Sequence, residues 1–258
     1  MDLRLTGKRA LVTGASGGLG AEIAAALAAE GVAVVVHGRD RTRTGQTAEK
    51  VGGRAVVGDL ATDAGAASVA TATGEVDILV NNAGVYDPAT GWASAGAGAW
   101  ADIYNVNVLS SVRLIGHLVP AMRANGWGRV IQIASVTGER PSASQPHYAA
   151  SNAARLNLAR SLARDLKHTG VTSNAVAAGG ILVPTTRDYL LELGRANGWG
   201  ETWEEIERNA TPIRAGTDVG RIGHPREYAD LVAYLASPVA DYITGTTLRM
   251  DGGSYDAA

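Results

Sequence analysis

The sequence contains no cysteine, and this absence excludes several kinds of site. Disulfide bonds, thiol nucleophiles and cysteine-ligated metal centres are impossible without it, and the sequence predicts no other metal site. Phenylalanine is also absent, whereas 33 of the 258 residues are glycine. We interpret the abundance of glycine and alanine as compositional bias without functional content.

An excess of one charge and long apolar runs are missing as well. The 23 Lys and Arg residues nearly balance the 25 Asp and Glu residues, and they form no basic block. The net charge of −2 gives no electrostatic reason to bind nucleic acid or an anionic membrane. The N-terminus lacks the apolar core of a signal peptide, and no apolar run reaches the roughly 18 residues that span a bilayer. We therefore expect a cytoplasmic protein without nucleic-acid or membrane partners.

Strand-like and helix-like patterns alternate along the chain, which predicts one α/β domain over residues 1–258. Short apolar runs predict strands at residues 8–13, 32–37, 55–58, 76–80, 129–134, 171–176 and 246–250. Helix-forming stretches predict helices at residues 21–30, 64–73, 99–124, 146–168 and 225–236.

Two further short helices, at residues 184–197 and 201–210, interrupt this alternation. They predict a helical lid over about residues 182–215, with Gly198 and Gly200 as hinges. Tyr189, Trp199 and Trp203 give this segment aromatic surface. That surface suits a sizeable apolar or aromatic ligand, or it simply packs the lid.

A glycine-rich turn directly follows the first predicted strand and opens the first predicted helix. Its glycines are spaced Gly14-x3-Gly18-x-Gly20, which differs from the G-x-G-x-x-G pattern of many dinucleotide sites. Glycines in such a turn allow backbone N–H groups to approach a pyrophosphate, and the helix N-terminus favours its negative charge. The position between strand and helix favours nucleotide binding over a turn without a ligand.

The end of the second predicted strand indicates which nucleotide is bound. An acidic residue there binds the adenosine ribose 2′-hydroxyl in NAD sites, but Gly38 and then Arg39 occupy this place. A guanidinium pairs well with a 2′-phosphate, so we predict that NADP(H) is preferred over NAD(H). Two alternatives stay open: Arg39 is a solvated loop residue, or Asp40 is the acid and the strand ends two residues later.

Polar residues also mark other places along the expected cleft. Asp59 follows the third strand and is placed to meet the adenine amino group. Asn81 and Asn82 follow the fourth strand, where they lock the neighbouring strand and line the cleft, or are ordinary turn residues. Asn107 lies in a helix that is otherwise apolar on that face, so its amide needs partners.

Tyr148 and Asn152 lie one helical turn apart at the start of the helix predicted at residues 146–168. They therefore share one face of that helix. A tyrosine with a polar neighbour in this position is suited to be a proton donor and its helper. The pair can equally be a plain surface pair, and this stretch alone does not decide between the two.

As a set, these features resemble the classical short-chain dehydrogenase/reductase family over essentially the whole chain. The resemblance depends on the turn at residues 13–20, Asp59, Asn81-Asn82-Ala83-Gly84, Asn107, Ser135, Tyr148 and Asp251-Gly252-Gly253. It implies a Rossmann-type, doubly wound parallel sheet of seven strands in the order 3-2-1-4-5-6-7, with helices on both faces. The cofactor would lie across the carboxyl ends of the strands.

The resemblance also implies hydride transfer between a nicotinamide and a carbonyl or alcohol. Tyr148 would be the general acid/base, Ser135 would polarise the substrate oxygen, and Asn107 would anchor a water in the proton path. The expected catalytic set is Tyr148, Ser135, Asn107 and Asn152. The expected cofactor-binding residues are Gly14, Ser16, Gly17, Gly18, Leu19, Gly20, Arg39, Asp59, Leu60, Asn81, Ala83, Gly84, Asn152, Gly179 and Ile181. The expected substrate-binding residues are Ser135, Tyr148, Gly180, Tyr189 and Trp199.

The chain departs from the family at the residue that assists Tyr148. The family has a lysine four residues after the tyrosine, and Asn152 stands there instead. An amide can still hold the nicotinamide ribose, but it has no charge to lower the pKa of the tyrosine. No lysine lies near this helix start; the lysines are Lys8, Lys50 and Lys167. Arg155 shares the face but lies about 10 Å further along the helix axis, so we predict an interface or surface residue.

A second departure is Ala178-Gly179, where the family usually has Pro-Gly. This loop normally backs the nicotinamide carboxamide through Ile181, so we expect it to be less stiff. Three explanations of the missing lysine are open: a working reductase, a diverged protein that binds the nucleotide with weak, absent or non-redox activity, or an introduced replacement of the lysine.

We expect an NADP(H)-dependent oxidoreductase, in the first instance a ketoreductase acting on a small carbonyl or alcohol. The resemblance further implies a homo-oligomer, a dimer or a tetramer. The helices at residues 99–124 and 148–168 would pair across one interface, where their small side chains allow close packing.

Overall fold

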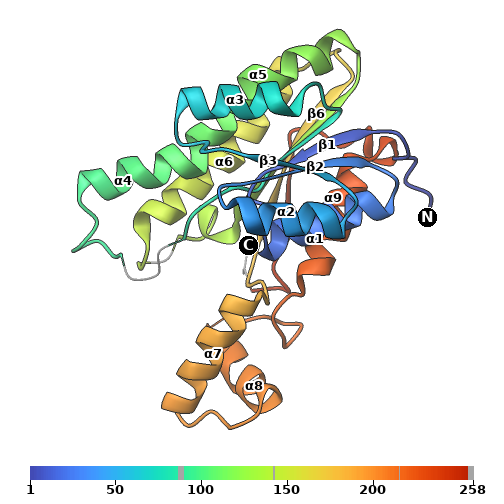
Figure 1. Ribbon diagram of the computed structural model, residues 1–258. Coiled ribbons are helices and arrows are strands. Elements are labelled where there is room, and N and C mark those ends of the chain that lie inside the picture. Colours follow the sequence, from blue (N-terminus) through green and yellow to red (C-terminus); the bar gives the residue numbers. More distant parts are fainter. Residues whose placement is uncertain (87–89, 142, 215, 255–258) are drawn as a thin grey trace.

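A parallel sheet of seven strands, in the order β3-β2-β1-β4-β5-β6-β7, forms the centre of the protein (Figure 1). The computed structural model describes residues 1–86, 90–141, 143–214 and 216–254. The predicted sheet and its strand order are confirmed. The strands are β1 (Arg9–Val12), β2 (Ala33–Gly38), β3 (Arg54–Val57), β4 (Ile78–Asn81), β5 (Gly128–Ser135), β6 (Val171–Ala178) and β7 (Thr247–Met250).

Helices cover both faces of the sheet (Figure 1). One face carries α1 (Gly18–Ala29), α2 (Arg41–Lys50) and α9 (Pro225–Ala236), and the other carries α3 (Asp63–Thr73), α5 (Ser110–Ala124) and α6 (Pro146–Asp165). Because both faces are covered, the inner strands are buried on both sides, which explains their continuous apolar runs. Within the described residues, no helix is both long enough and apolar enough to cross a membrane.

The helix α2 was not among the predicted elements. Its sequence, RTRTGQTAEK, is poor in apolar residues and shows no helical periodicity. The helix begins because Asp40 caps it, its carboxylate accepting a hydrogen bond from the Arg43 backbone N–H at 2.9 Å. The buried side chains of Thr44 and Ala48 then provide its contact with the core. The Asp40 cap and this small contact with the core therefore stabilise a helix that hydrophobic periodicity does not predict.

The helix predicted at residues 99–124 is continuous but not regular. The helix α4 (Ala97–Tyr104) passes through a π-helical segment, Asn105–Leu109, into α5. A π segment inside an α-helix often accompanies a functional site. Here it contains the buried Asn107, which was singled out from the sequence because its amide needs partners.

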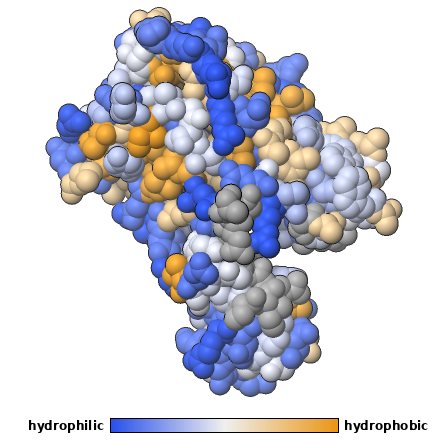
Figure 2. Space-filling view, turned by 180° about the vertical axis from the view of Figure 1, so that it is seen from behind, coloured by the Kyte–Doolittle hydropathy of each residue, from blue (hydrophilic) through white to orange (hydrophobic). Residues whose placement is uncertain are grey.

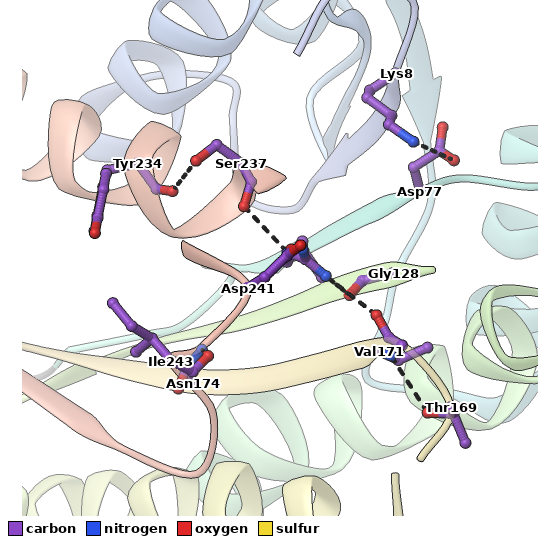
Figure 3. A network of polar contacts seen from close by, with 12 residues as sticks. Lys8, Asp77, Gly128, Thr169, Val171, Asn174, Tyr234, Ser237, Asp241 and Ile243 are labelled. Atoms are coloured by element: carbon purple, nitrogen blue, oxygen red, sulfur yellow. Dashed lines mark hydrogen bonds and ion pairs between the residues drawn. The ribbon is translucent and has the colours of Figure 1, made fainter. Parts of the chain in front are cut away.

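A buried arginine fixes the first residues of β5. Arg129 is 1% exposed, and its guanidinium bonds to the carbonyls or carboxylate of Gly128, Gly170, Ser237 and Asp241. Figure 3 shows Gly128, Ser237 and Asp241 gathered at this point. Because Ser237 and Asp241 follow α9, the network joins the start of β5 to a segment more than 100 residues later.

The helices α7 (Pro184–Ala196) and α8 (Trp203–Arg214) occupy the segment predicted as a lid. They project from the main body (Figure 1) as a separate, mostly hydrophilic lobe (Figure 2). The lobe has its own small core, formed by Leu190, Ala210, Ile222, Leu182, Trp199 and Trp203. Residue 215 at the end of the predicted lid, and residues 255–258 of the predicted domain, lie outside the described residues. A lid function for the lobe stays a prediction.

Candidate functional site

The glycine-rich turn lies at the carboxyl end of β1 and runs into the N-terminus of α1. Gly14 has φ 62°, a left-handed conformation that favours glycine, and a Cβ there would lie 2.9 Å from the Ala83 Cα. A Cβ at Gly20 would lie 2.5 Å from the Gly14 carbonyl oxygen. These two positions therefore require glycine, and they bring the backbone of the turn close to the loop after β4.

Side-chain hydrogen bonds lock that loop to the turn. The Asn82 amide donates to the carbonyls of Thr13 at 2.9 Å and Gly14 at 3.1 Å. The Thr13 hydroxyl oxygen accepts hydrogen bonds from the backbone N–H groups of Asn82 and Ala83. The lock predicted for the asparagine pair is made by Asn82, whereas Asn81 ends β4 with a buried side chain.

A cleft next to the turn has the polar lining expected of an adenosine site. The predicted residues Gly14, Ser16, Arg39, Asp59, Leu60, Ala83 and Gly84 all line it. His37 and Arg43 line it as well and were not predicted. His37 bonds to the Gly58 carbonyl at 3.1 Å and to the Gly14 N–H at 3.4 Å, and burial lowers its pKa, so it is neutral at pH 7. No sequence signal indicated Arg43, because the helix α2 that carries it was not predicted.

The end of β2 leaves no room for an acidic side chain at position 38. A Cβ on Gly38 would lie 2.3 Å from the Thr44 hydroxyl and 2.9 Å from the Ser16 Cβ. The Asp40 carboxylate already has two partners, since it caps α2 and lies 3.6 Å from the Arg43 Nε. The alternative in which Asp40 is the ribose-binding acid therefore competes with its role as the cap of α2.

A second cleft continues from the first, and Gly14, Ala83, Gly84 and Val85 line both. The predicted Gly17, Leu19, Gly20, Asn107, Ser135, Tyr148, Asn152, Gly179 and Ile181 all line this second cleft. The structure thus brings the expected proton donor, its neighbours and the nicotinamide end of the expected cofactor site together.

The Tyr148 phenol is half-buried at the start of α6. Burial raises its pKa above the ordinary value, because the charged phenolate is poorly solvated there. Arg155 acts in the opposite direction by its charge, followed by the polar side chains of Asn152 and Ser135. The Tyr86 ring packs edge-on against the Tyr148 ring, with centroids 5.1 Å apart. Tyr86 was not predicted, and its loop gave no periodic signal.

Ser135 and Asn152 flank the phenol. The Ser135 hydroxyl oxygen accepts hydrogen bonds from the Thr137 N–H at 3.2 Å and the Thr137 hydroxyl at 3.0 Å. Its own proton is thereby available for a third partner in the cleft. Asn152 is 2% exposed, and its amide donates to the Tyr148 carbonyl at 3.0 Å. That bond orients the amide on the face that Tyr148 occupies.

Asn107 holds the loop after β4 against α6. Its side-chain oxygen accepts from the Val85 N–H at 2.7 Å, and its amide donates to the Val85 carbonyl and the Ser151 hydroxyl, each at 3.1 Å. The partners that its amide required are therefore backbone and side-chain groups of the cleft wall. The proposed water in a proton path is not tested by these contacts.

Arg155 corrects one sequence-based expectation. We predicted an interface or surface residue, but its side chain is 3% exposed and lines the second cleft with Tyr148 and Asn152. Its guanidinium donates to the carbonyls of Ala83, at 3.2 Å, and Asn81. The prediction was wrong because it compared axial positions only, whereas helical side chains lean back toward the N-terminus.

Five predicted site residues do not line either cleft: Gly18, Asn81, Gly180, Tyr189 and Trp199. Gly18 is the first residue of α1, and the Gly180 carbonyl accepts a hydrogen bond from the Tyr228 hydroxyl at 3.1 Å. Tyr189 is 51% exposed on α7, and Trp199 packs within the lobe. The expected substrate contacts from the lobe stay predictions. Among the described residues, no group of three or more His, Asp or Glu could hold a metal ion.

Comparisons with known proteins identify the family and the fold. The sequence matches the family model described as short chain dehydrogenase over residues 8–192. It is 37% identical over 261 residues to the uncharacterized oxidoreductase YvaG of Bacillus subtilis, with 98% of both chains covered. It is 36% identical to the 3-oxoacyl-[acyl-carrier-protein] reductase FabG of Escherichia coli, with 98% of this chain and 99% of that one covered. The L-sorbose reductase of Gluconobacter frateurii, solved with NADPH and L-sorbose, superposes over 100% of both chains with a TM-score of 0.91 at 31% identity.

Proposed function

This chain belongs to the short-chain dehydrogenase family of oxidoreductases, and we propose that it is an NADPH-dependent ketoreductase. One observation carries the proposal: Tyr148 and Ser135 line the cleft that continues from the glycine-rich turn. A proton donor and a hydroxyl donor therefore lie where a carbonyl oxygen would meet a dinucleotide bound along both clefts.

The residues of the turn fit a dinucleotide. Gly17 and Gly18 leave the N-terminus of α1 without side chains, and a helix N-terminus favours the negative charge of a pyrophosphate. The two clefts share four lining residues, so an extended ligand could occupy both without a break. The adenosine end would lie beside Arg39 and Asp59, and the nicotinamide end beside Tyr148 and Ile181.

A 2′-phosphate suits the adenosine end better than a 2′-hydroxyl. Arg39 and Arg43 both line the first cleft, and Gly38 occupies the place of an acidic side chain. Guanidinium groups form strong charge-assisted hydrogen bonds with phosphate oxygens. Solved structures similar to this chain include the L-sorbose reductase with NADPH and Pseudomonas aeruginosa RhlG with NADP.

The reduction requires one hydride and one proton. NADPH, when bound, supplies the hydride to the carbonyl carbon. Tyr148 gives its phenolic proton to the carbonyl oxygen, and the resulting phenolate regains a proton from solvent. Ser135 donates a hydrogen bond to the same oxygen and stabilises the charge that develops on it. Asn152 carries an uncharged amide one turn after Tyr148 and lines the same cleft, so it is suited to hold a ribose hydroxyl.

A second candidate function is nucleotide binding without turnover. It is favoured by one observation, the burial that raises the pKa of Tyr148 at a site without a lysine. One experiment on a single sample distinguishes the two candidate functions. NADPH affinity is measured by quenching of protein fluorescence, and NADPH consumption is measured with a panel containing a 3-oxoacyl thioester, a ketose and simple ketones.

The reductase proposal expects consumption with at least one ketone and none above background for Tyr148→Phe. Binding without consumption across the panel supports the second candidate. The substrate is proposed only as a small carbonyl or alcohol, because the relatives named above include reductases of chemically different ketones.

We also propose a homo-oligomer, a dimer or a tetramer, built through α5 and α6. Leu109 ends the π-helical segment and Val112 lies in the first turn of α5; both are apolar, and they are 43% and 45% exposed. Their exposure supports an interface there. Sedimentation of the purified protein tests this, and a monomer at micromolar concentration would contradict it.

A further inference from the structure

A buried cation lies in the cleft whose expected ammonium is missing. Arg155 lines the second cleft with Tyr148 and Asn152, and only 3% of its surface is exposed. Burial of a cation costs free energy unless an anion or hydrogen bonds compensate it. The contacts of the Arg155 guanidinium therefore indicate the role of its positive charge.

Neutral groups supply the hydrogen bonds of the guanidinium. Its two terminal nitrogens donate to the carbonyls of Ala83 and Asn81, and its buried Nε has no hydrogen-bond partner among the described residues. Burial lowers the pKa of Arg155 to about 10, so the group is still charged at pH 7. The titratable group that acts on it is Tyr148.

The direction of the helix brings this charge toward the phenol. Arg155 follows Tyr148 by seven residues, about 10 Å along the axis. Side chains on a helix lean toward its N-terminus, and arginine is long, so the guanidinium reaches back over the turn that contains Asn152. Its bonds to the loop after β4 hold it inside the cleft.

The phenol has few other charged neighbours. The charged and titratable groups that face it are Arg155 from α6 and Tyr86 from the loop after β4. Asn152 and Ser135 are its uncharged polar neighbours, and His147, beside it on α6, packs against Trp100 of α4 with centroids 6.2 Å apart. Among the described residues, the groups that shift these two pKa values most include no carboxylate.

We propose that Arg155 is the cation that favours ionisation of Tyr148, in the role that a lysine at position 152 would otherwise have. When Tyr148 gives its proton to a substrate oxygen, it becomes a phenolate, and the guanidinium stabilises that negative charge until solvent returns a proton. Arg155 thus acts through Tyr148 as a positioning residue and contacts no reacting atom. Its relevance to turnover rests on the proposed function, whereas its effect on the phenol does not.

A purely structural role is the competing explanation, because Arg155 also ties the loop after β4 to α6. Variants that keep or remove the positive charge at position 155 distinguish the two roles. Arg155→Gln keeps an amide donor for the loop and loses the charge, whereas Arg155→Lys keeps the charge. Asn152→Lys combined with Arg155→Gln puts a charge back one turn earlier on the same helix face.

The direct measurement is the ionisation of Tyr148 in the protein without substrate. The near-ultraviolet absorbance of phenolate is followed against pH, and the same titration of the Tyr148→Phe variant of each protein is subtracted. An opposite charge nearby shifts a pKa by about 1 to 3 units. We expect the midpoint for Arg155→Gln to rise by at least about one pH unit, Arg155→Lys to stay near the unsubstituted protein, and the double variant to return toward it.

An unchanged midpoint in folded Arg155→Gln, checked by circular dichroism, overturns the proposal. If Arg155→Gln alone does not fold, the double variant is compared with Asn152→Lys alone. Removing Arg155 should still raise the midpoint there, and equal midpoints overturn the proposal as well. If the protein is active, removing the charge of Arg155 should also raise the pH above which ketone reduction declines. Absence of turnover refutes the proposed function without affecting the titration result.

Discussion

Tyr148 and Arg155 lie on one face of α6 and line one cleft, with the uncharged Asn152 between them in the sequence. The residue that carries positive charge in this cleft is therefore three positions later than the place of the family lysine. The guanidinium is held by Asn81 and Ala83, the last residue of β4 and the loop behind it. The charge and the wall of the cofactor cleft are thus fixed by the same contacts.

Restoring a lysine at position 152 should make Tyr148 more acidic. The Asn152→Lys ammonium would lie one turn from the phenol, and an added positive charge favours the phenolate. Ketone reduction needs the protonated phenol, so its decline at high pH should move down by about one pH unit. The reverse reaction, which needs the phenolate, should gain activity at neutral pH. The pH profile of kcat checks both directions, and an unmoved profile would contradict the assignment of Tyr148 as the acid.

Removing Arg39 should weaken NADPH binding and leave NADH binding almost unchanged. A hydrogen-bonded charge pair with the 2′-phosphate contributes about 1.5–3 kcal/mol, so the Kd of Arg39→Ala for NADPH should rise about 10- to 100-fold. Arg41→Ala is the matched control, because Arg41 is an exposed arginine of α2 that does not line the cleft. Equal affinities of the unsubstituted protein for NADPH and NADH would argue against the 2′-phosphate assignment.

Breaking the ion pair between the buried Arg129 and the exposed Asp241 should destabilise the fold without touching either cleft. Asp241→Ala leaves the Arg129 charge with carbonyl partners only, which should cost about 1–3 kcal/mol of unfolding free energy. Asp230→Ala is the control, since its pair with Arg226 is exposed on α9 and should change stability by less than about 0.5 kcal/mol. Urea denaturation measures both, and equal effects would show that burial of Arg129 carries no energetic weight.

The sequence predicted the sheet well because its strands are local apolar runs bounded by glycines and polar residues. It did not predict α2, because that helix depends on the Asp40 cap and a narrow contact through Thr44 and Ala48. It predicted the Asn107 helix but not its π-helical segment, since that change of period coincides with contacts to Val85, distant in the sequence.

The sequence predicted the site residues that belong to a motif at the end of a strand. It did not predict residues whose long side chains contact the site from distant positions in the sequence. Arg155 was placed wrongly because axial spacing ignores the length and tilt of its side chain. Tyr86 was not predicted because the contact with Tyr148 depends on the path of the loop after β4. The packing of Trp199 with the small core of the lobe was likewise not singled out from the sequence, and its expected contact with substrate stays a prediction.

The most direct test of the account is ketone-dependent NADPH oxidation as a function of pH, compared between the unsubstituted protein and Tyr148→Phe at saturating NADPH. We predict measurable turnover that declines above the pKa of Tyr148, because only the protonated phenol gives its proton to the carbonyl. We also predict at least about a 100-fold loss for Tyr148→Phe, the lower range of general acid catalysis. NADPH affinity should remain within a few-fold. Equal turnover and the same pH profile in the two proteins would contradict the account.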